Sequence, residues 1–129
     1  ADPDRIAIYG ASYGGYAAMA GLVFTPELYR CGINYVGVTD VQLLFSTVPR
    51  EDRFRLLYRA HLVGDPKSDA ELLMRISPVN HIEKLRAPVM LAYGFRDSRV
   101  DIKHARKLIA ELKRLNKSHE AMIADNEGH

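Results

Sequence analysis

The sequence has little cysteine, no long apolar run and almost no excess of either charge. Its single cysteine, Cys31, excludes an internal disulfide framework and a zinc module built from several cysteines. No stretch reaches the roughly 18 consecutive apolar residues that a membrane-spanning helix requires, so we expect no membrane span. The 18 basic and 16 acidic side chains leave a net charge of only +2. So small a charge gives no support to nucleic acid as a partner.

The composition otherwise fits a folded domain. Of the 129 residues, 47% are hydrophobic and 26% are charged, a balance that allows a hydrophobic core. A chain of this length is one domain or part of one. Because the sequence starts at Ala1 without a methionine and stops at His129, we expect it to be a piece of a larger protein.

Strands and helices are expected to alternate along the chain. Short apolar runs bounded by turn residues predict strands at 5–9, 31–38, 87–94 and 119–124. Helices are expected at 16–24 and 102–115, with two or three short helices between 41 and 76. Alternation of this kind implies right-handed βαβ connections and a parallel sheet. The predicted fold class is α/β, with helices flanking a parallel sheet.

The helix expected after Asp101 has the clearest periodicity. Asp101 is its expected N-cap, and His104 is expected on its charged, solvent-facing side. An earlier helix is expected to begin with a capping box, Ser68 followed by Glu71. The apolar residues that predict one buried face of the later helix are Ile102, Ala105, Leu108, Ile109, Leu112 and Leu115.

Residues 10–14, Gly-Ala-Ser-Tyr-Gly, match the pattern G-x-S-x-G. The match directly follows a predicted strand and directly precedes a helix rich in small residues, which is the setting of a nucleophile elbow. Such a sharp turn forces strained backbone angles on Ser12 and leaves no room for side chains two residues to either side. The serine oxygen is then held above the sheet, at the positive end of a helix. The alternative is a serine in an ordinary strand-to-helix turn.

A nucleophilic serine needs a base and an orienting acid, because its hydroxyl is a weak nucleophile at neutral pH. Asp97 lies three residues after Gly94, in the loop that follows a predicted strand; Asp101 is the alternative, although it is better placed to cap the next helix. His129 follows the last predicted strand. The carboxyl ends of parallel strands share one edge of a sheet, where open α/β folds bind ligands. We therefore expect Ser12, Asp97 and His129 to meet there, although each alone could be an ordinary surface or terminal residue.

The other histidines and the cysteine indicate no further site. No pair of histidines has a metal-binding spacing with a nearby carboxylate, so we expect no metal ion and no cofactor. Cys31 is expected to be a small buried hydrophobic residue.

The run Gly-Ala-Ser-Tyr-Gly-Gly-Tyr at 10–16 resembles the nucleophile region of the prolyl oligopeptidase family of serine peptidases. Residues 87–100 resemble the strand and acid loop of that family, and residues 126–129, Asn-Glu-Gly-His, resemble its histidine turn. The dipeptidyl-peptidase and acylaminoacyl-peptidase branches are the most similar. The resemblance covers the whole chain and departs from the family at Tyr93, where a histidine commonly precedes the glycine.

This resemblance implies the C-terminal half of an α/β-hydrolase catalytic domain, spanning residues 1–129. It implies that Ser12 attacks a peptide carbonyl, that His129 is the base and Asp97 its orienting acid, and that the backbone N–H of Tyr13 contacts the oxyanion. The upstream strands of the sheet and a β-propeller are implied elsewhere in the parent chain. The resemblance also implies an apolar substrate pocket, although its residues could equally belong to the core: Val38, Val41, Leu44 and Val100.

Three functions are compatible with these residues. The favoured one is a serine peptidase that acts on short peptides, because the Ser-Tyr-Gly-Gly-Tyr run is typical of such enzymes. An esterase or other acyl hydrolase of the same fold would use the same triad chemistry. The third is a catalytically incompetent segment with a structural or interaction role.

Overall fold

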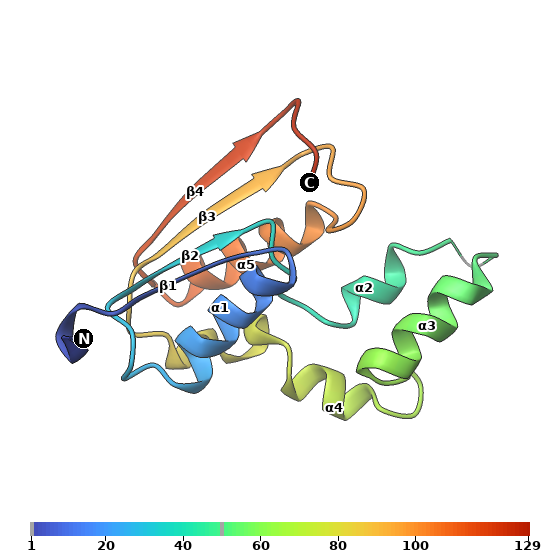
Figure 1. Cartoon of the computed structure of the whole chain (residues 1–129), viewed down its shortest axis with the longest axis horizontal. Coiled ribbons are helices and arrows are strands. Elements are labelled where there is room, and N and C mark those ends of the chain that lie inside the picture. The colour runs from blue at the N-terminus through green and yellow to red at the C-terminus, as the bar shows by residue number, and fades with distance from the viewer. Residues whose placement is uncertain (1, 50) are drawn as a thin grey trace.

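A parallel sheet forms the centre of the computed structural model, which describes residues 2–49 and 51–129 (Figure 1). Its four strands lie in the order β1–β2–β3–β4, and every neighbouring pair is parallel. The carboxyl ends of all strands therefore lie at one edge. The prediction of an α/β fold with a parallel sheet is confirmed. The strands are β1 Ala7–Ala11, β2 Cys31–Tyr35, β3 Val89–Gly94 and β4 His119–Ala124.

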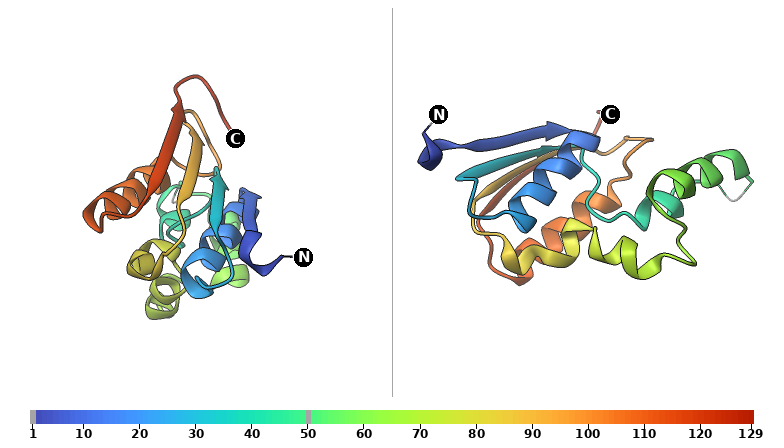
Figure 2. Two further views of the ribbon diagram at one scale, coloured as in Figure 1. Left: turned by 90° about the vertical axis from the view of Figure 1, so that its left-hand side faces the viewer. Right: turned by 60° about the horizontal axis from the view of Figure 1, so that its bottom comes forward.

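Two α-helices and a 3-10 helix cover one face of the sheet, and the helices between residues 43 and 75 extend past its carboxyl edge (Figure 2). The covering elements are α1 Tyr13–Phe24, α5 Lys103–Arg114 and the 3-10 helix η2 Pro78–Lys84. The segment between β2 and β3 also forms the short helices predicted there, and a 3-10 turn, η1 Pro3–Arg5, precedes β1. None of the helices in the described ranges is long and apolar enough to cross a bilayer. The short helices are α2 Leu43–Ser46, α3 Arg53–Val63 and α4 Ala70–Arg75.

The core lies between the sheet and these covering helices. Met19 and Leu22 of α1, Leu91 of β3 and Leu108 and Leu112 of α5 are at most 1% exposed. Helix α1 contacts β1 and β2 on one side and η2 on the other, which explains why apolar residues occur all around it. The apolar stripe predicted for the helix at 102–115 packs into this core, as expected.

The opposite face of the sheet is apolar and, within the described ranges, has no helix against it (Figure 2). Tyr9, Ile33, Tyr35 and Met90 are all exposed on it. The expectation of a buried Cys31 is wrong, because Cys31 is exposed. Side chains alternate along a strand, so Cys31 points to the same open face as Ile33 and Tyr35.

Several element boundaries differ from those expected. The first strand is Ala7–Ala11 rather than 5–9, because the residues before it form a 3-10 turn. The second strand ends at Tyr35 rather than at residue 38, because Val36 has a left-handed φ of 45° that interrupts the extended backbone. The expected capping box is also wrong: Asp69, not Ser68, precedes α4.

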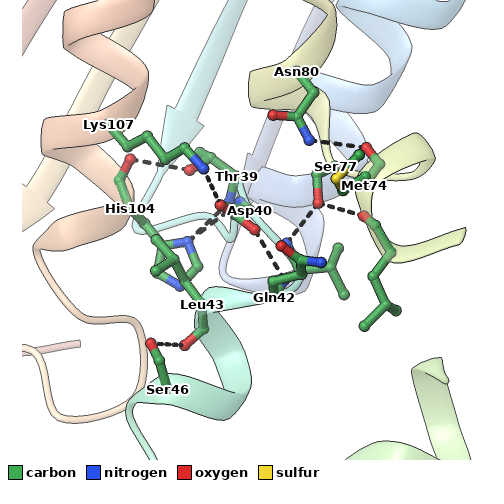
Figure 3. Close-up of polar contacts among 12 residues, drawn as sticks. Thr39, Asp40, Gln42, Leu43, Ser46, Met74, Ser77, Asn80, His104 and Lys107 are labelled. Atoms are coloured by element: carbon green, nitrogen blue, oxygen red, sulfur yellow. Dashed lines mark hydrogen bonds and ion pairs between the residues drawn. The ribbon is translucent and has the colours of Figure 1, made fainter. Parts of the chain in front are cut away.

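The expectation that His104 faces solvent is wrong as well. His104 is 0% exposed, and its ring Nδ1 faces the backbone N–H groups of Thr39 and Asp40 at 3.3 and 3.4 Å (Figure 3). Nδ1 is therefore an acceptor and Nε2 carries the hydrogen. Burial lowers the pKa of His104 to about 4, although the nearby carboxylates of Asp40 and Asp101 partly oppose the shift. Asp40 is itself paired with Lys107.

We predict that His104 makes the protein less stable in mild acid. Because its pKa falls from the ordinary 6.5 to about 4 on folding, the unfolded chain binds more protons across this interval. The free energy of unfolding should decrease as the pH falls from 6.5 towards 4, by up to about 3 kcal/mol from this group. Urea unfolding at several pH values should show a flatter dependence for His104→Gln than for the wild type. The matched control is His61→Gln on an exposed position of α3, and equal slopes for both variants would contradict the prediction.

Candidate active site

The strand-to-helix turn at Ser12 has the strained geometry that the G-x-S-x-G pattern predicts. Ser12 lies between β1 and α1 with φ 56° and ψ −117°, a conformation that L-residues rarely adopt and that persists only where the surroundings enforce it. Its N–H donates to the carbonyl oxygen of Tyr35 at 2.9 Å, and its own carbonyl oxygen accepts from the N–H of Tyr16 at 3.1 Å. The turn is thus fixed to both β2 and α1.

Gly10 is required because the backbone of Gly14 lies too close to it for any side chain. A Cβ atom at Gly10 would lie 2.0 Å from the carbonyl oxygen of Gly14, far inside van der Waals contact. By contrast, a Cβ atom at Gly14 would meet no heavy atom within 4 Å. Only the first of these two glycines is therefore demanded by packing within this chain.

Ser12, His129 and Asp97 form one continuous series of hydrogen bonds. The Oγ atom of Ser12 lies 2.8 Å from Nε2 of His129, and Nδ1 of His129 lies 2.7 Å from Oδ2 of Asp97. The three residues come from the loops that follow β1, β4 and β3. The structure thus brings together the three side chains that the sequence singles out, at the carboxyl edge of the sheet.

Backbone contacts hold the acid loop and the histidine loop against each other. The N–H of Phe95 donates to the carbonyl oxygen of Ala124, and the N–H of Arg96 donates to that of Glu127, both at 2.9 Å. These bonds continue the β3–β4 pairing beyond the strands, so that the segment ending at His129 lies over the carboxyl edge of the sheet.

The hydrogen bonds of Asp97 favour its ionised form. Its side chain is 0% exposed, and its Oδ1 accepts the backbone N–H groups of Arg99 at 2.7 Å and Val100 at 2.9 Å. Burial alone would raise its pKa, but the hydrogen bonds from Val100, His129 and Arg99 outweigh burial and lower the pKa of Asp97 below its ordinary value. An anionic Asp97 accepts the Nδ1–H of His129, which leaves Nε2 as the acceptor that faces Ser12. The alternative acid, Asp101, instead accepts the N–H of Lys103 at the start of α5.

Tyr13 is the first residue of α1. The first N–H groups of a helix have no acceptor within the helix and lie at its positive end. The backbone N–H of Tyr13 is therefore available to an oxygen that carries negative charge beside Ser12.

A cavity of about 440 Å³ opens beside Ser12. All four residues predicted for a substrate pocket line it, and their side chains are apolar: Val38, Val41, Leu44 and Val100.

Further residues that the sequence patterns did not single out also line this cavity. Leu62 and Val63 reach it from the end of α3, Ile76 from the residue after α4, Tyr16 from α1 and Arg99 from the acid loop. Arg99 is the one charged side chain among the described lining residues. Tyr16 belongs to the Ser-Tyr-Gly-Gly-Tyr run and Arg99 to the acid loop, so both could have been assigned to the site from the motifs that contain them. The two residues of α3 could not be assigned to the site in this way, because they lie in no motif and α3 has no buried residue that would fix its orientation.

No group of three or more His, Cys, Asp or Glu side chains that could hold a metal ion is found among residues 2–49 and 51–129.

Comparison with known proteins identifies the family of this site. A family profile described as the prolyl oligopeptidase family matches residues 1–129. The chain belongs to this family. The prolyl oligopeptidase family is a family of serine-type peptidases with some inactive relatives, and the family predicted from residues 10–16 is confirmed. Dipeptidyl aminopeptidase BIII of Pseudoxanthomonas mexicana is 33% identical over 128 residues, which cover 98% of this chain and 19% of that protein.

Solved structures of peptidases share the fold of the chain. An acylaminoacyl peptidase of Pyrococcus horikoshii is 26% identical with a TM-score of 0.89, and the match covers 100% of this chain and 20% of that one. A puromycin-hydrolyzing peptidase of Mycobacterium tuberculosis is 25% identical with a TM-score of 0.90, covering 100% and 19%. The chain therefore spans about a fifth of the length of these relatives, and its α/β-hydrolase fold is confirmed.

We predict that the two glycines of the turn respond oppositely to alanine. Gly10→Ala should destabilise the protein by about 1–3 kcal/mol or more, because its new methyl group overlaps backbone atoms. Gly14→Ala should leave stability unchanged or raise it by up to about 1 kcal/mol, because alanine favours the helix and meets free space. Thermal unfolding of the two variants checks this difference, and equal melting temperatures would contradict it.

Proposed function

We propose that this chain carries the catalytic triad of a serine peptidase that cleaves short peptides through an acyl-enzyme. The observation that carries the proposal is the hydrogen-bonded series from Ser12 through His129 to Asp97, with separations of 2.8 and 2.7 Å. Nucleophile, base and orienting acid within hydrogen-bond reach of one another are the arrangement that activates a serine hydroxyl.

Each residue has one role in the proposed reaction. Ser12 Oγ attacks the peptide carbonyl carbon while Nε2 of His129 takes the hydroxyl proton. The imidazolium then gives this proton to the departing amine, which leaves an ester between Ser12 and the acyl part of the substrate. Water then attacks the ester carbonyl while Nε2 of His129 takes its proton. This proton passes to Oγ of Ser12 as the acyl part leaves as a carboxylic acid, which returns Ser12 and His129 to their starting states. Asp97 holds the tautomer of His129 and stabilises its positive charge throughout.

The oxyanion of each tetrahedral intermediate would lie against the backbone N–H of Tyr13. Loss of one oxyanion donor typically lowers turnover by 10²–10³-fold, so a complete site needs a second donor. We propose that the second donor comes from the rest of a larger catalytic domain, and that residues 1–129 alone would be a weak enzyme at most. The exposed apolar face with Tyr9, Ile33 and Met90 supports a larger domain, because parallel sheets normally bury both faces.

The cavity beside Ser12 supports an apolar side chain at P1, the substrate residue that supplies the cleaved carbonyl. Val38, Val41 and Val100 lie on its wall, and a positively charged side chain placed there would lose its hydration and be repelled by Arg99. The printed names of the relatives, a dipeptidyl aminopeptidase and an acylaminoacyl peptidase, support peptides as substrates.

The nucleophile assignment is tested on the full-length protein that contains this chain. A fluorophosphonate probe should label the wild type and should not label Ser12→Ala. Ser46→Ala, which removes an exposed hydroxyl in α2 that donates to Leu43, is the matched control and should be labelled like the wild type. Asp97→Asn should lower kcat by about 10⁴-fold, because it favours the wrong tautomer of His129. Retained labelling of Ser12→Ala would refute the proposal.

The substrate assignment is tested with peptide anilides that differ only at P1. We expect kcat/KM to be about 100-fold or more higher for phenylalanine than for lysine, because the cavity is apolar and Arg99 repels a second cation. Equal values would contradict the apolar pocket. Cleavage of esters with no cleavage of any anilide would instead indicate an esterase of the same fold.

A further inference from the structure

Val36 stands out because it is strained and buried at the same time. Its φ is 45°, which for a β-branched residue is a genuine outlier, and it is only 2% exposed. It begins the loop 36–41, which contributes Val38 and Val41 to the cavity beside Ser12. Strain of this kind persists only where neighbouring contacts over-determine the backbone.

A closed ring of three hydrogen bonds holds the next residue, Gly37, and so restrains the peptide unit on the carboxyl side of Val36. The hydroxyl of Tyr93 donates to the carbonyl oxygen of Gly37 at 2.7 Å and accepts from Nδ2 of Asn34 at 2.9 Å. The Oδ1 atom of Asn34 in turn accepts the N–H of Gly37 at 2.9 Å. Both side chains are at most 2% exposed. Burial raises the pKa of the Tyr93 hydroxyl well above its ordinary value, so the hydroxyl remains a donor at any pH used for assays.

We propose that Tyr93 and Asn34 are positioning residues that hold the loop 36–41 in its strained conformation and thereby fix the wall of the cavity beside Ser12. The consequence for substrate selection rests on the proposed peptidase function. The role in holding the loop does not.

The far end of the loop is fixed independently of this ring. The N–H groups of Thr39 and Asp40 face Nδ1 of His104, and the N–H of Val41 donates to Oγ of Ser77 at 2.8 Å (Figure 3). Residues 39–41 are held there, and the N–H of Val36 donates to the carbonyl oxygen of Ala92 at 2.8 Å. The remaining freedom therefore lies in residues 37 and 38, next to the ring. Val38 is therefore the wall residue that loss of the ring should displace most.

The ring acts on the cavity rather than on the nucleophile. Ser12 is held by its N–H bond to Tyr35, which precedes the strained residue, and by its place between β1 and α1. The loop and the ring also pack on Gly15 of α1, where an added Cβ atom would lie 2.6 Å from Cα of Gly37 and 2.6 Å from Oδ1 of Asn34. Loss of the ring should thus change which substrates fit before it changes the reactivity of Ser12.

The test compares Tyr93→Phe with Tyr29→Phe in the full-length protein. Tyr29 also packs against the core, and its hydroxyl has no hydrogen bond in the part of the chain that the structure describes, so it controls for loss of a hydroxyl alone. Amide hydrogen exchange at Gly37 and Val38 should be about tenfold faster in Tyr93→Phe and unchanged in Tyr29→Phe. Asn34→Ala, which removes the other side chain of the ring, should also make amide exchange in the loop faster.

The ratio of kcat/KM for anilides with phenylalanine and with alanine at P1 distinguishes positioning of the cavity wall from a general effect on stability, because a general loss of stability would lower both values alike. The ratio of their kcat/KM values should fall about tenfold in Tyr93→Phe, chiefly through KM for phenylalanine, because misplacement of a pocket wall weakens the larger side chain more. The rate of labelling by a small fluorophosphonate should stay within about twofold of the wild type, since Ser12 is unaffected. Wild-type exchange or an unchanged ratio in Tyr93→Phe would overturn the inference. If the wild type were neither labelled nor active, the proposed function would fail, and hydrogen exchange would still decide the role of the ring in holding the loop.

Discussion

The hydrogen-bonded contact of His129 with both Ser12 and Asp97 is the interaction on which the proposed chemistry depends. It exists because three parallel strands end at one edge, so that loops far apart in sequence converge above the sheet. No single loop contains the site. A change in strand register by one residue would turn every side chain of a strand to the other face, and would separate these groups without altering any of them.

Two backbone strains lie side by side at this edge, at Ser12 and at Val36. The first places the Ser12 hydroxyl within hydrogen-bond distance of Nε2 of His129, and the second starts the loop that lines the neighbouring cavity. Each is held by hydrogen bonds from the adjacent strand, through Tyr35 for Ser12 and through Ala92, whose carbonyl oxygen accepts the N–H of Val36 at 2.8 Å. The regular sheet therefore stabilises the irregular backbone of the proposed site.

The sequence predicts the fold class and the convergence of the site well, because both follow from local patterns and parallel topology. The burial of His104 could not be predicted from the sequence, since it depends on contacts with the backbone N–H groups of Thr39 and Asp40, which are 65 and 64 residues away in sequence. The strain at Val36 was equally hidden, because a valine after an apolar run normally continues a strand. Leu62 could not be placed at the cavity, because α3 has no buried residue to orient it. Long-range packing decides such positions.

The most direct test of the account is to map the residue that reacts. The full-length protein is incubated with a fluorophosphonate, digested and analysed by mass spectrometry to locate the adduct. The account predicts a single phosphonylated peptide modified at Ser12, with modification blocked when the protein is unfolded beforehand. An adduct at another serine, or a folded protein that carries none, would contradict it.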